Sequence, residues 1–447
     1  NPHDVAAHVA TGAAGLPLGE WIRGRGWDQN LWTPPEFPTH ALLDDVAPDH
    51  PVALRRVDGH ALWVNSAALA VAGITRNTPD PVGGRIVRDS AGEATGILVD
   101  NAMDLVEKKI PVDSPAVIER KILAATAAAT AAGLTAVHEM GITDEVVDVY
   151  RRLAAEGRLS LRVYALLAGE DLIATLPQRR PDADPDGTAF FVLRAVKLFA
   201  DGALGSRGAA LLAPYEDEPA NRGLVLLDDA QLAAAAQLAA ASGWQLAIHA
   251  IGDRANRSVL DAYEAAGKGR DLAALRFRIE HAQVLSPEDL PRFAALGVAA
   301  SMQPTHATSD MGWADERLGK ERLYGAYAWR SIVDSGAHLV AGSDFPVEEV
   351  SPLLGLYAAV TRQDSDGKPD GGFFPAQRLS LDEAIHAFTV APAWAAFAEG
   401  QRGRIVPGAV ADLTVFDRDL AADQRLLTTK VDLTVVGGRT VYQRRQE

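Results

Sequence analysis

The sequence predicts an α/β fold in which parallel strands alternate with helices and close into a (β/α)8 barrel of the TIM type. Three observations predict it. From Ser114 to about residue 400, apolar strand-like runs recur with helical segments between them. Several of these runs end in metal-type ligands, which a barrel would bring to one face. The chain has 447 residues, of which 48% are hydrophobic, and this is enough for a barrel and a second domain.

The alternation of strand and helix starts with an Ala-rich helix over 115–132, which Gly133 ends. A strand over 134–139 and a helix over 142–156 follow it. The other expected strands cover 161–166, 194–199, 246–249, 276–281, 297–303 and 338–344. These runs add up to a parallel barrel in which one strand is missing from the given chain.

The segments on either side of this pattern differ from it. Before it we expect a strand over 21–28, a strand over 51–60, a helix over 61–72 and a hairpin over 84–99. After residue 401, short alternating strands with glycine turns, over 403–417 and 431–443, predict part of a small β domain.

Composition excludes several classes of function. The net charge of −16 argues against binding to nucleic acid or to anionic membranes. No apolar run approaches the roughly 20 residues that a membrane span needs. The chain has no cysteine, so disulfides and thiolate metal sites are excluded and any metal must bind nitrogen and oxygen ligands.

Lys197 lies inside an apolar run, Arg194-Ala-Val-Lys-Leu-Phe-Ala, that leads into the glycine-rich loop Asp201-Gly-Ala-Leu-Gly-Ser. Burying an ammonium group costs several kcal/mol unless the group is paired or chemically altered. One interpretation is therefore a functional lysine. The alternative is a core lysine that reaches a carboxylate at the end of the strand.

Three further expected strand ends carry metal-type ligands. His249 and His281 each end an apolar run, and Asp344 follows the run that starts at His338. A single histidine in this position is usually an ordinary hydrogen-bonded residue. The order Lys, His, His, Asp, with about one βα unit between successive members, instead predicts a divalent metal site of imidazole and carboxylate ligands.

This order resembles that of the amidohydrolase superfamily. The local motifs KLFADGALGSRGAAL, IHAIGDRAN, RIEHAQ, QPTH, GSDFPVE and GRIVPGAVADLTVFD are similar, as a set, to amidohydrolase family 3, which includes N-substituted formamide deformylases. The resemblance covers the chain from about Gly19 to its C-terminus.

The resemblance implies hydrolysis of an amide-type C–N bond by a metal-activated water. It implies that Lys197, His249, His281 and Asp344 bind one or two divalent ions, most simply Zn²⁺. Lys197 matches a position where relatives carry a carboxylated lysine that bridges two metals. Asp344 would also be the catalytic residue that shuttles the proton. Glu139, at the end of an earlier strand, is an alternative carboxylate ligand.

Family members also carry a His-x-His pair on the first barrel strand, and no two of the 11 histidines here are two residues apart. We therefore expect the sequence to lack an N-terminal segment with that strand and part of a β-sandwich domain; the alternative is a degenerate protein. The expected domains are an insertion between the first two barrel strands (1–114), the hydrolase barrel (115–400) and the C-terminal part of the sandwich (401–447).

Four residues are candidates for substrate binding. Asp58 and His60 lie at an expected strand-to-helix junction, where a helix cap with a local hydrogen bond is the alternative. His306 and Trp313 belong to a long expected loop, 305–327, after the seventh strand. The alternative for this loop is packing on the rim of the barrel.

We expect a cytoplasmic protein that can form a homodimer. Its expected partner is a small-molecule amide substrate, and we expect it to bind neither nucleic acid nor a membrane. Two other classes of function stay open. One is a metal-dependent lyase or isomerase on the same barrel, because a fold does not fix its chemistry. The other is a non-catalytic binding protein, which a true loss of the His-x-His pair would favour.

Overall fold

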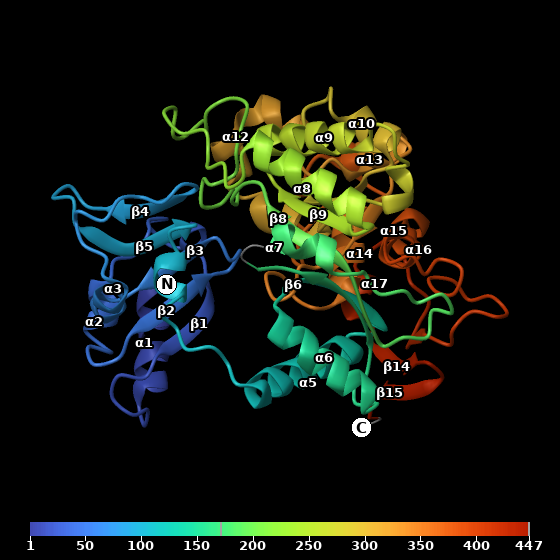
Figure 1. Ribbon diagram of the computed structural model, residues 1–447, viewed down its shortest axis with the longest axis horizontal. Helices are drawn as coiled ribbons and strands as arrows, with labels where there is room; N and C mark the ends of the chain where they lie inside the picture. Colours follow the sequence, from blue (N-terminus) through green and yellow to red (C-terminus); the bar gives the residue numbers. More distant parts are fainter. Residues whose placement is uncertain (170–171, 446–447) are drawn as a thin grey trace. The chain divides into compact units, whose positions relative to one another are not determined.

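The computed structural model describes residues 1–169 and 172–445, which form two compact units (Figure 1). The first unit comprises Asn1–Val112, Asp201–Leu227 and Glu316–Gly319. The second comprises Asp113–Ala200, Asp228–Asp315 and Lys320–Glu447. The division into three domains that the sequence suggests remains a prediction.

The first unit is built on a five-stranded sheet in the order β1-β2-β3-β5-β4. Its strands are β1 (Ile22–Trp27), β2 (Val52–Arg56), β3 (Ala61–Val64), β4 (Gly84–Arg88) and β5 (Ala94–Asp100). Its helices are α1 (Pro2–Ala13), α2 (Ala41–Asp44), α3 (Ser66–Ala72) and α4 (Asp104–Glu107). The two strands expected first are present as β1 and β2, and the expected hairpin is β4–β5.

The predicted helix over 61–72 is wrong in its first half, because residues 61–64 form β3. Gly59, with φ of +83°, lets the chain turn tightly after β2 and return antiparallel to it. Trp63 is then fully buried in the sheet, and its indole donates to Thr39 O at 3.0 Å. Helix α3 begins only after Asn65, whose side chain caps it by accepting from the Ala68 amide at 3.0 Å.

The second unit contains seven parallel strands in the order β12-β11-β10-β9-β8-β7-β6, so each strand pairs with the next in sequence. They are β6 (Ala136–Ile142), β7 (Arg162–Leu167), β8 (Phe191–Phe199), β9 (Gln245–Ala250), β10 (Arg278–His281), β11 (Ala299–Met302) and β12 (Leu339–Ala341). All seven strands expected from residue 134 onward are present. Such sequential parallel pairing is typical of the wall of a βα barrel.

Helices precede, connect and follow these strands, and several of them pack against the sheet (Figure 1). They are α5 (Pro115–Ala131), α6 (Asp144–Ala155), α7 (Leu172–Thr175), α8 (Asp229–Ser242), α9 (Asp253–Gly267), α10 (Leu290–Leu296), α13 (Trp329–Asp334), α14 (Pro352–Thr361), α15 (Leu381–Phe388), α16 (Val390–Ala395) and α17 (Arg425–Thr428). The predicted helices over 115–132 and 142–156 are confirmed as α5 and α6. Among the helices described, none has both the length and the apolar character to cross a bilayer.

One side-chain contact shows that the sheet is strongly curled. Arg278 of β10 donates from Nη1 to Nδ1 of His138 of β6 at 2.7 Å. These strands are four positions apart in the sheet, and neighbouring strands are separated by about 4.8 Å, so a flat sheet would hold them about 19 Å apart. An arginine side chain cannot span that distance. The inner faces of β6 and β10 must therefore face each other across a lumen.

The lumen contains a buried polar network centred on Arg278, which is 1% exposed. Its Nε lies 2.8 Å from Glu280 Oε1, and its Nη2 donates to Ser301 Oγ at 2.9 Å. Burial lowers the pKa of His138 well below its usual value, and the Arg278 charge adds to this effect. His138 is therefore neutral and accepts the proton that Arg278 offers.

A small antiparallel sheet, β13 (Leu413–Phe416), β14 (Val431–Val436) and β15 (Arg439–Gln443), follows in the second unit. Thr434 Oγ1 of β14 donates to Thr130 O of α5 at 2.8 Å. Asp412, just before β13, forms an ion pair of 2.7 Å with Arg162 of β7. These contacts tie the sheet to the base of the curled sheet. Whether it belongs to a β-sandwich stays a prediction.

The segment over 305–327, predicted as a long loop, is largely helical. Pro304 starts α11 (Pro304–Asp310) from the first turn, where a proline is favourable because no hydrogen bond is lost. A second helix, α12 (Ala314–Arg322), follows it, and Gly319, with φ of +69°, interrupts this helix. The prediction failed because the polar and charged residues of 314–322 were interpreted as loop, although most of them are good helix formers.

We expect Glu280→Ala to destabilise the protein by about 3–5 kcal/mol, because it leaves the Arg278 charge buried without its carboxylate. The measurement is the free energy of unfolding in urea. Glu288→Ala is the matched control: Glu288 is 81% exposed and its pair with Arg257 contributes at most about 1 kcal/mol. Equal effects of the two substitutions would show that the ion pair in the lumen does not stabilise the sheet.

We also expect His138 to make stability depend on pH. In the unfolded chain its pKa is about 6.5, and in the fold it is well below this value, so only the unfolded chain gains the proton as pH falls below about 6.5. The stability that neutral His138 provides is present above that pH and is lost below it. The melting temperature should fall more steeply from pH 6.5 to 5 in the wild type than in His138→Gln, whose amide oxygen can still accept from Arg278. Parallel curves would contradict this assignment.

Candidate active site

Three of the four predicted metal ligands lie at the carboxyl ends of adjacent strands. Lys197 is in β8, His249 is in β9, and His281 is the last residue of β10. The imidazole rings of His249 and His281 meet edge to face, with centroids 4.6 Å apart. His249 is 1% exposed and Lys197 is 4% exposed. The curled sheet thus brings together two imidazoles, of which His249 is buried and His281 is half-buried.

The side chain of Lys197 contacts the ring of Phe199, which lies next to the ring of His249. Its Nζ lies 3.5 Å from the centre of the Phe199 ring, and that ring lies 5.3 Å from the His249 ring. Nζ also donates to Leu198 O at 3.4 Å. Gly141, a bulged residue of β6 with φ of +104°, would place a Cβ 3.5 Å from Lys197 Cγ, so the lysine stem packs closely on it.

Glu139 is not brought to this region. Successive residues of a strand face opposite sides of a sheet, and its neighbour His138 faces the lumen. Glu139 therefore faces α6, where Tyr150 Oη donates to its Oε2 at 3.2 Å. Burial raises the pKa of Glu139, and the hydrogen bond from Tyr150 opposes this rise. The structure thus does not support Glu139 as an alternative carboxylate ligand.

His281 has two further neighbours on the segment after β11. Its Nδ1 lies 2.8 Å from Oε1 of Gln303, which directly follows β11. Its ring is stacked on His306 of α11, with centroids 5.8 Å apart and planes at 21°. His306, predicted to bind substrate, therefore lies next to a predicted metal ligand. Gln303 was quoted in the motif QPTH but received no role; its position at a strand end was the signal that could have identified it.

Asp344 is half-buried in the loop after β12 and has φ of +56°. The Phe345 amide donates to Ser343 Oγ at 3.2 Å, and the Val347 amide donates to Asp344 O at 2.8 Å. Burial raises the pKa of Glu348, and the charge of Asp344 adds to the rise, against a hydrogen bond from Ser309. Asp344 therefore shares this loop with a second carboxylate that the sequence analysis did not single out.

The residues present fit part of a metal centre. Two facing imidazoles are suitable nitrogen donors for a zinc-type ion. Within residues 1–169 and 172–445, however, no group of three or more His, Asp or Glu side chains is arranged to hold a metal ion. The pair His249 and His281 is therefore the part of such a centre that these residues form. The metal roles of Lys197 and Asp344 remain predictions.

The other three predicted substrate residues are Trp313, Asp58 and His60. Trp313 precedes α12 and is 9% exposed, so it is mostly packed inside the protein. Asp58 and His60 belong to the first unit, at the turn between β2 and β3. Asp58 Oδ1 accepts from the His60 amide at 3.1 Å, which is the local hydrogen bond that the sequence analysis offered as the alternative.

His60 has a partner that the sequence did not indicate. Its Nδ1 lies 2.6 Å from Oδ1 of Asp100, a buried carboxylate at the end of β5. Burial lowers the pKa of His60, but the Asp100 and Asp58 carboxylates outweigh burial and raise it above its usual value. The carboxylates of its own unit therefore favour the protonated form of His60.

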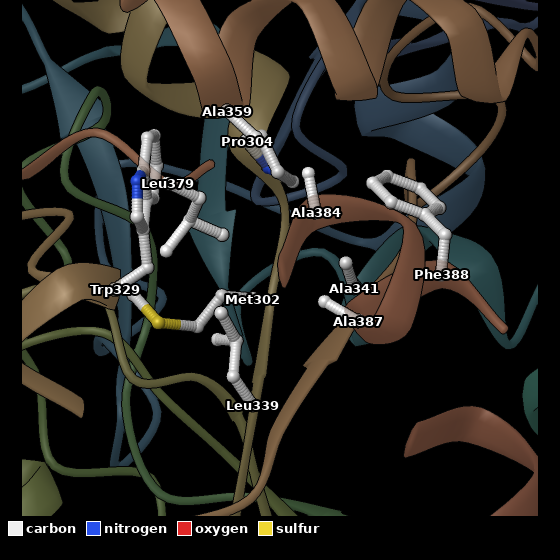
Figure 2. Close-up of a pocket in the computed structure, with 10 residues that line it drawn as sticks. All are labelled: Met302, Pro304, Trp329, Leu339, Ala341, Ala359, Leu379, Ala384, Ala387 and Phe388. Atoms are coloured by element: carbon white, nitrogen blue, oxygen red, sulfur yellow. The ribbon is translucent and has the colours of Figure 1, made fainter. Parts of the chain in front are cut away.

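Residues of β11 and β12 and of the helices packed on them line an apolar cavity (Figure 2). Its walls are side chains such as Met302 and Leu339 from the strands, and Ala359 and Phe388 from helices α14 and α15. Binding sites need a few polar groups to orient a ligand, and this lining contains none except the indole of Trp329. Met302 also faces away from Ser301 and from the lumen. The cavity is therefore not a substrate site.

Comparison with known proteins identifies the family. A family model described as the amidohydrolase family matches residues 1–442. YtcJ of Bacillus subtilis is 37% identical over 96% of this chain and 81% of its own length. The N-substituted formamide deformylase of Arthrobacter pascens is 30% identical over 96% of this chain and 80% of its own length. An uncharacterized metal-dependent hydrolase from Pyrococcus horikoshii has a similar crystal structure, with a TM-score of 0.71, 28% identity, and coverage of 91% of this chain and 77% of that one.

The fold and these matches identify the class of the protein. It is a hydrolase of carbon–nitrogen bonds that is built on a curled parallel βα sheet. Within that class, the chain belongs to amidohydrolase family 3. The resemblance drawn from the motifs is confirmed.

We expect His249→Ala and His281→Ala each to lower the content of divalent metal and the activity together, because each removes an imidazole of the facing pair. The measurement is elemental analysis of purified protein beside the hydrolytic rate. His386→Ala is the control, since His386 lies exposed on α15. Unchanged metal content in both variants would mean that this pair does not bind metal.

Proposed function

We propose that the protein hydrolyses an amide-type bond of a small molecule, such as an N-substituted formamide or an N-acyl amine, with the help of a divalent metal, most simply Zn²⁺. The single observation that carries this proposal is the facing pair His249 and His281 at the carboxyl ends of β9 and β10. The relatives support it: one is a deformylase of N-substituted formamides, and one similar structure is a metal-dependent hydrolase.

In this proposal His249 and His281 hold the ion through neutral imidazoles. A bound divalent ion would lower the pKa of a water molecule toward about 7 and polarise the substrate carbonyl. Asp344 accepts a proton from the water and returns it to the leaving nitrogen. His306, stacked on His281, contacts the substrate beside the reacting bond. Trp313, Asp58 and His60 are further proposed substrate contacts.

We propose a second role for Lys197. A neutral lysine amine can add to CO2, forming an N–C bond and releasing one proton, and the product is an anionic carbamate. This change would turn a buried cation into an oxygen ligand for one or two ions. The burial of Lys197 supports the proposal, because burial disfavours the charged ammonium and the neutral amine is the form that reacts.

We also propose that the curled sheet is part of a complete barrel. In the part of the chain that the structure describes, β6 and β12 are the two edge strands of the curled sheet. An eighth strand between them would complete a (β/α)8 barrel, and a His-x-His pair on that strand would add two nitrogen donors. The small sheet β13–β15 would then belong to a β-sandwich domain.

We expect Asp344→Asn to lower kcat by about 10²- to 10⁴-fold, which is the usual contribution of a general acid–base group. The amide keeps the shape but cannot take the proton, and the histidines should still retain most of the metal. The measurement is kcat on the best substrate of a panel of N-formyl and N-acyl amines, with product analysis that separates hydrolysis from elimination or isomerisation.

The control for this variant is Asp370→Asn, because Asp370 is 88% exposed and pairs only with Lys368 among the contacts described. It should leave kcat unchanged. If Asp344→Asn stays within a few-fold of the wild type, Asp344 caps its loop instead of moving protons, and its place in the mechanism is lost.

A further inference from the structure

Gln303 occupies an unusual position for a residue without an assigned role. It directly follows Met302, the last residue of β11, and it precedes Pro304, the first residue of α11. Its side chain is half-buried and reaches His281 of the neighbouring strand, with 2.8 Å between Oε1 and Nδ1. The contact therefore joins the ends of β10 and β11 beside the facing imidazoles.

The orientation of the Gln303 amide follows from its other contact. Its Nε2 donates to Ser301 O at 3.4 Å, and a backbone carbonyl can only accept. The opposite orientation would place the amide oxygen against the Ser301 carbonyl oxygen, and both of these atoms are acceptors. The amide oxygen of Gln303 therefore faces His281.

This orientation determines the tautomer of His281. An amide oxygen has no proton to give, so Nδ1 of His281 must carry the proton and donate it. The lone pair of the neutral ring is then on Nε2. A histidine that binds a metal usually donates its other ring N–H to an oxygen in this manner, which fixes both the tautomer and the ring orientation.

Packing alone does not make this choice. The ring of His281 lies between His249, at 4.6 Å, and His306, at 5.8 Å, and these contacts fix the plane of the ring. A rotation of the ring by about 180° about its Cβ–Cγ bond keeps this plane. It exchanges nitrogen and carbon positions but hardly changes the shape of the ring. The hydrogen bond to Gln303 does distinguish the two orientations.

We propose that Gln303 is a positioning residue that holds His281 in the Nδ1–H tautomer, so that Nε2 is the nitrogen that binds the metal. The inference rests on the proposed function for the identity of the ligand, but the tautomer itself does not depend on it. Gln303 acts through His281 and is not itself a ligand or a catalytic residue.

The first test is the tautomer in metal-free protein. ¹⁵N NMR of protein with labelled histidine distinguishes Nδ1–H from Nε2–H, and His281→Ala identifies the His281 signals. We expect Nδ1–H in the wild type and in Gln303→Glu, whose carboxylate also accepts. In Gln303→Met, which keeps the length but cannot accept, we expect a shift to Nε2–H or to a mixture. Nε2–H in the wild type would overturn the inference without any variant.

The second test is metal affinity, measured by Zn²⁺ titration against a competing chelator. Loss of such a supporting hydrogen bond typically weakens metal binding about 10- to 100-fold, and we expect this loss in Gln303→Met but not in Gln303→Glu. The matched control is Gln377→Met. Gln377 is also a buried, hydrogen-bonded amide, with Ser331 as its partner, but it lies in the 3₁₀ helix Pro375–Gln377. It should leave the affinity and the His281 tautomer unchanged.

The outcomes separate this inference from the proposed function. If the wild type binds no metal, the proposed function fails, while the NMR result still decides the role of Gln303. If Gln303→Met keeps the Nδ1–H tautomer and binds Zn²⁺ within about 3-fold of the wild type, Gln303 is only a structural residue. An equal loss of affinity in Gln303→Met and Gln377→Met would lead to the same conclusion, because it would reflect general destabilisation.

Discussion

The hydrogen bond from Arg278 to His138 across the lumen is the contact on which the geometry of the second unit depends. It joins strands that are four positions apart, and it requires that the sheet curl until its first strands face its later ones. The same curl makes the carboxyl ends of β8, β9 and β10 converge. Because Glu280 offsets the charge of Arg278 and Ser301 accepts another of its protons, the cation can lie in a nearly dry interior.

Much of this unit could be predicted from sequence because its signals are local. Each strand is an apolar run of a few residues, and Lys197, His249 and His281 stand at the ends of such runs. The contact between Arg278 and His138 could not be predicted, because it joins residues that are 140 positions apart. The partners of Gln303 and Asp100 could not be predicted either, although the position of Gln303 at a strand end was visible in the sequence. The periodicity of a sequence does not indicate which distant residues pair, so these contacts were recognised only in the fold.

The errors in predicting elements have a common cause. Residues 61–64 were assigned to a helix, and the helical segments of 304–322 were assigned to a loop. In both places the local pattern was ambiguous, and at 314–322 polar residues that are good helix formers were interpreted as loop. Gly59 permits the turn that makes β3 a strand, and Gly319 interrupts α12. A glycine in a sequence shows that a special conformation is permitted but does not show where the chain goes next.

The glycine-rich motif after Lys197 serves both units. Lys197 belongs to the curled sheet, whereas residues from Asp201 onward belong to the first unit. There, Asp100 packs against the motif so closely that a Cβ at Gly202 or Gly208 would lie 2.2 or 2.4 Å from its Oδ2. These two glycines are therefore required by the close approach of a buried carboxylate, which in turn holds His60 through its other oxygen. Packing in the first unit thus accounts for these two glycines of the motif, independently of the role proposed for its lysine.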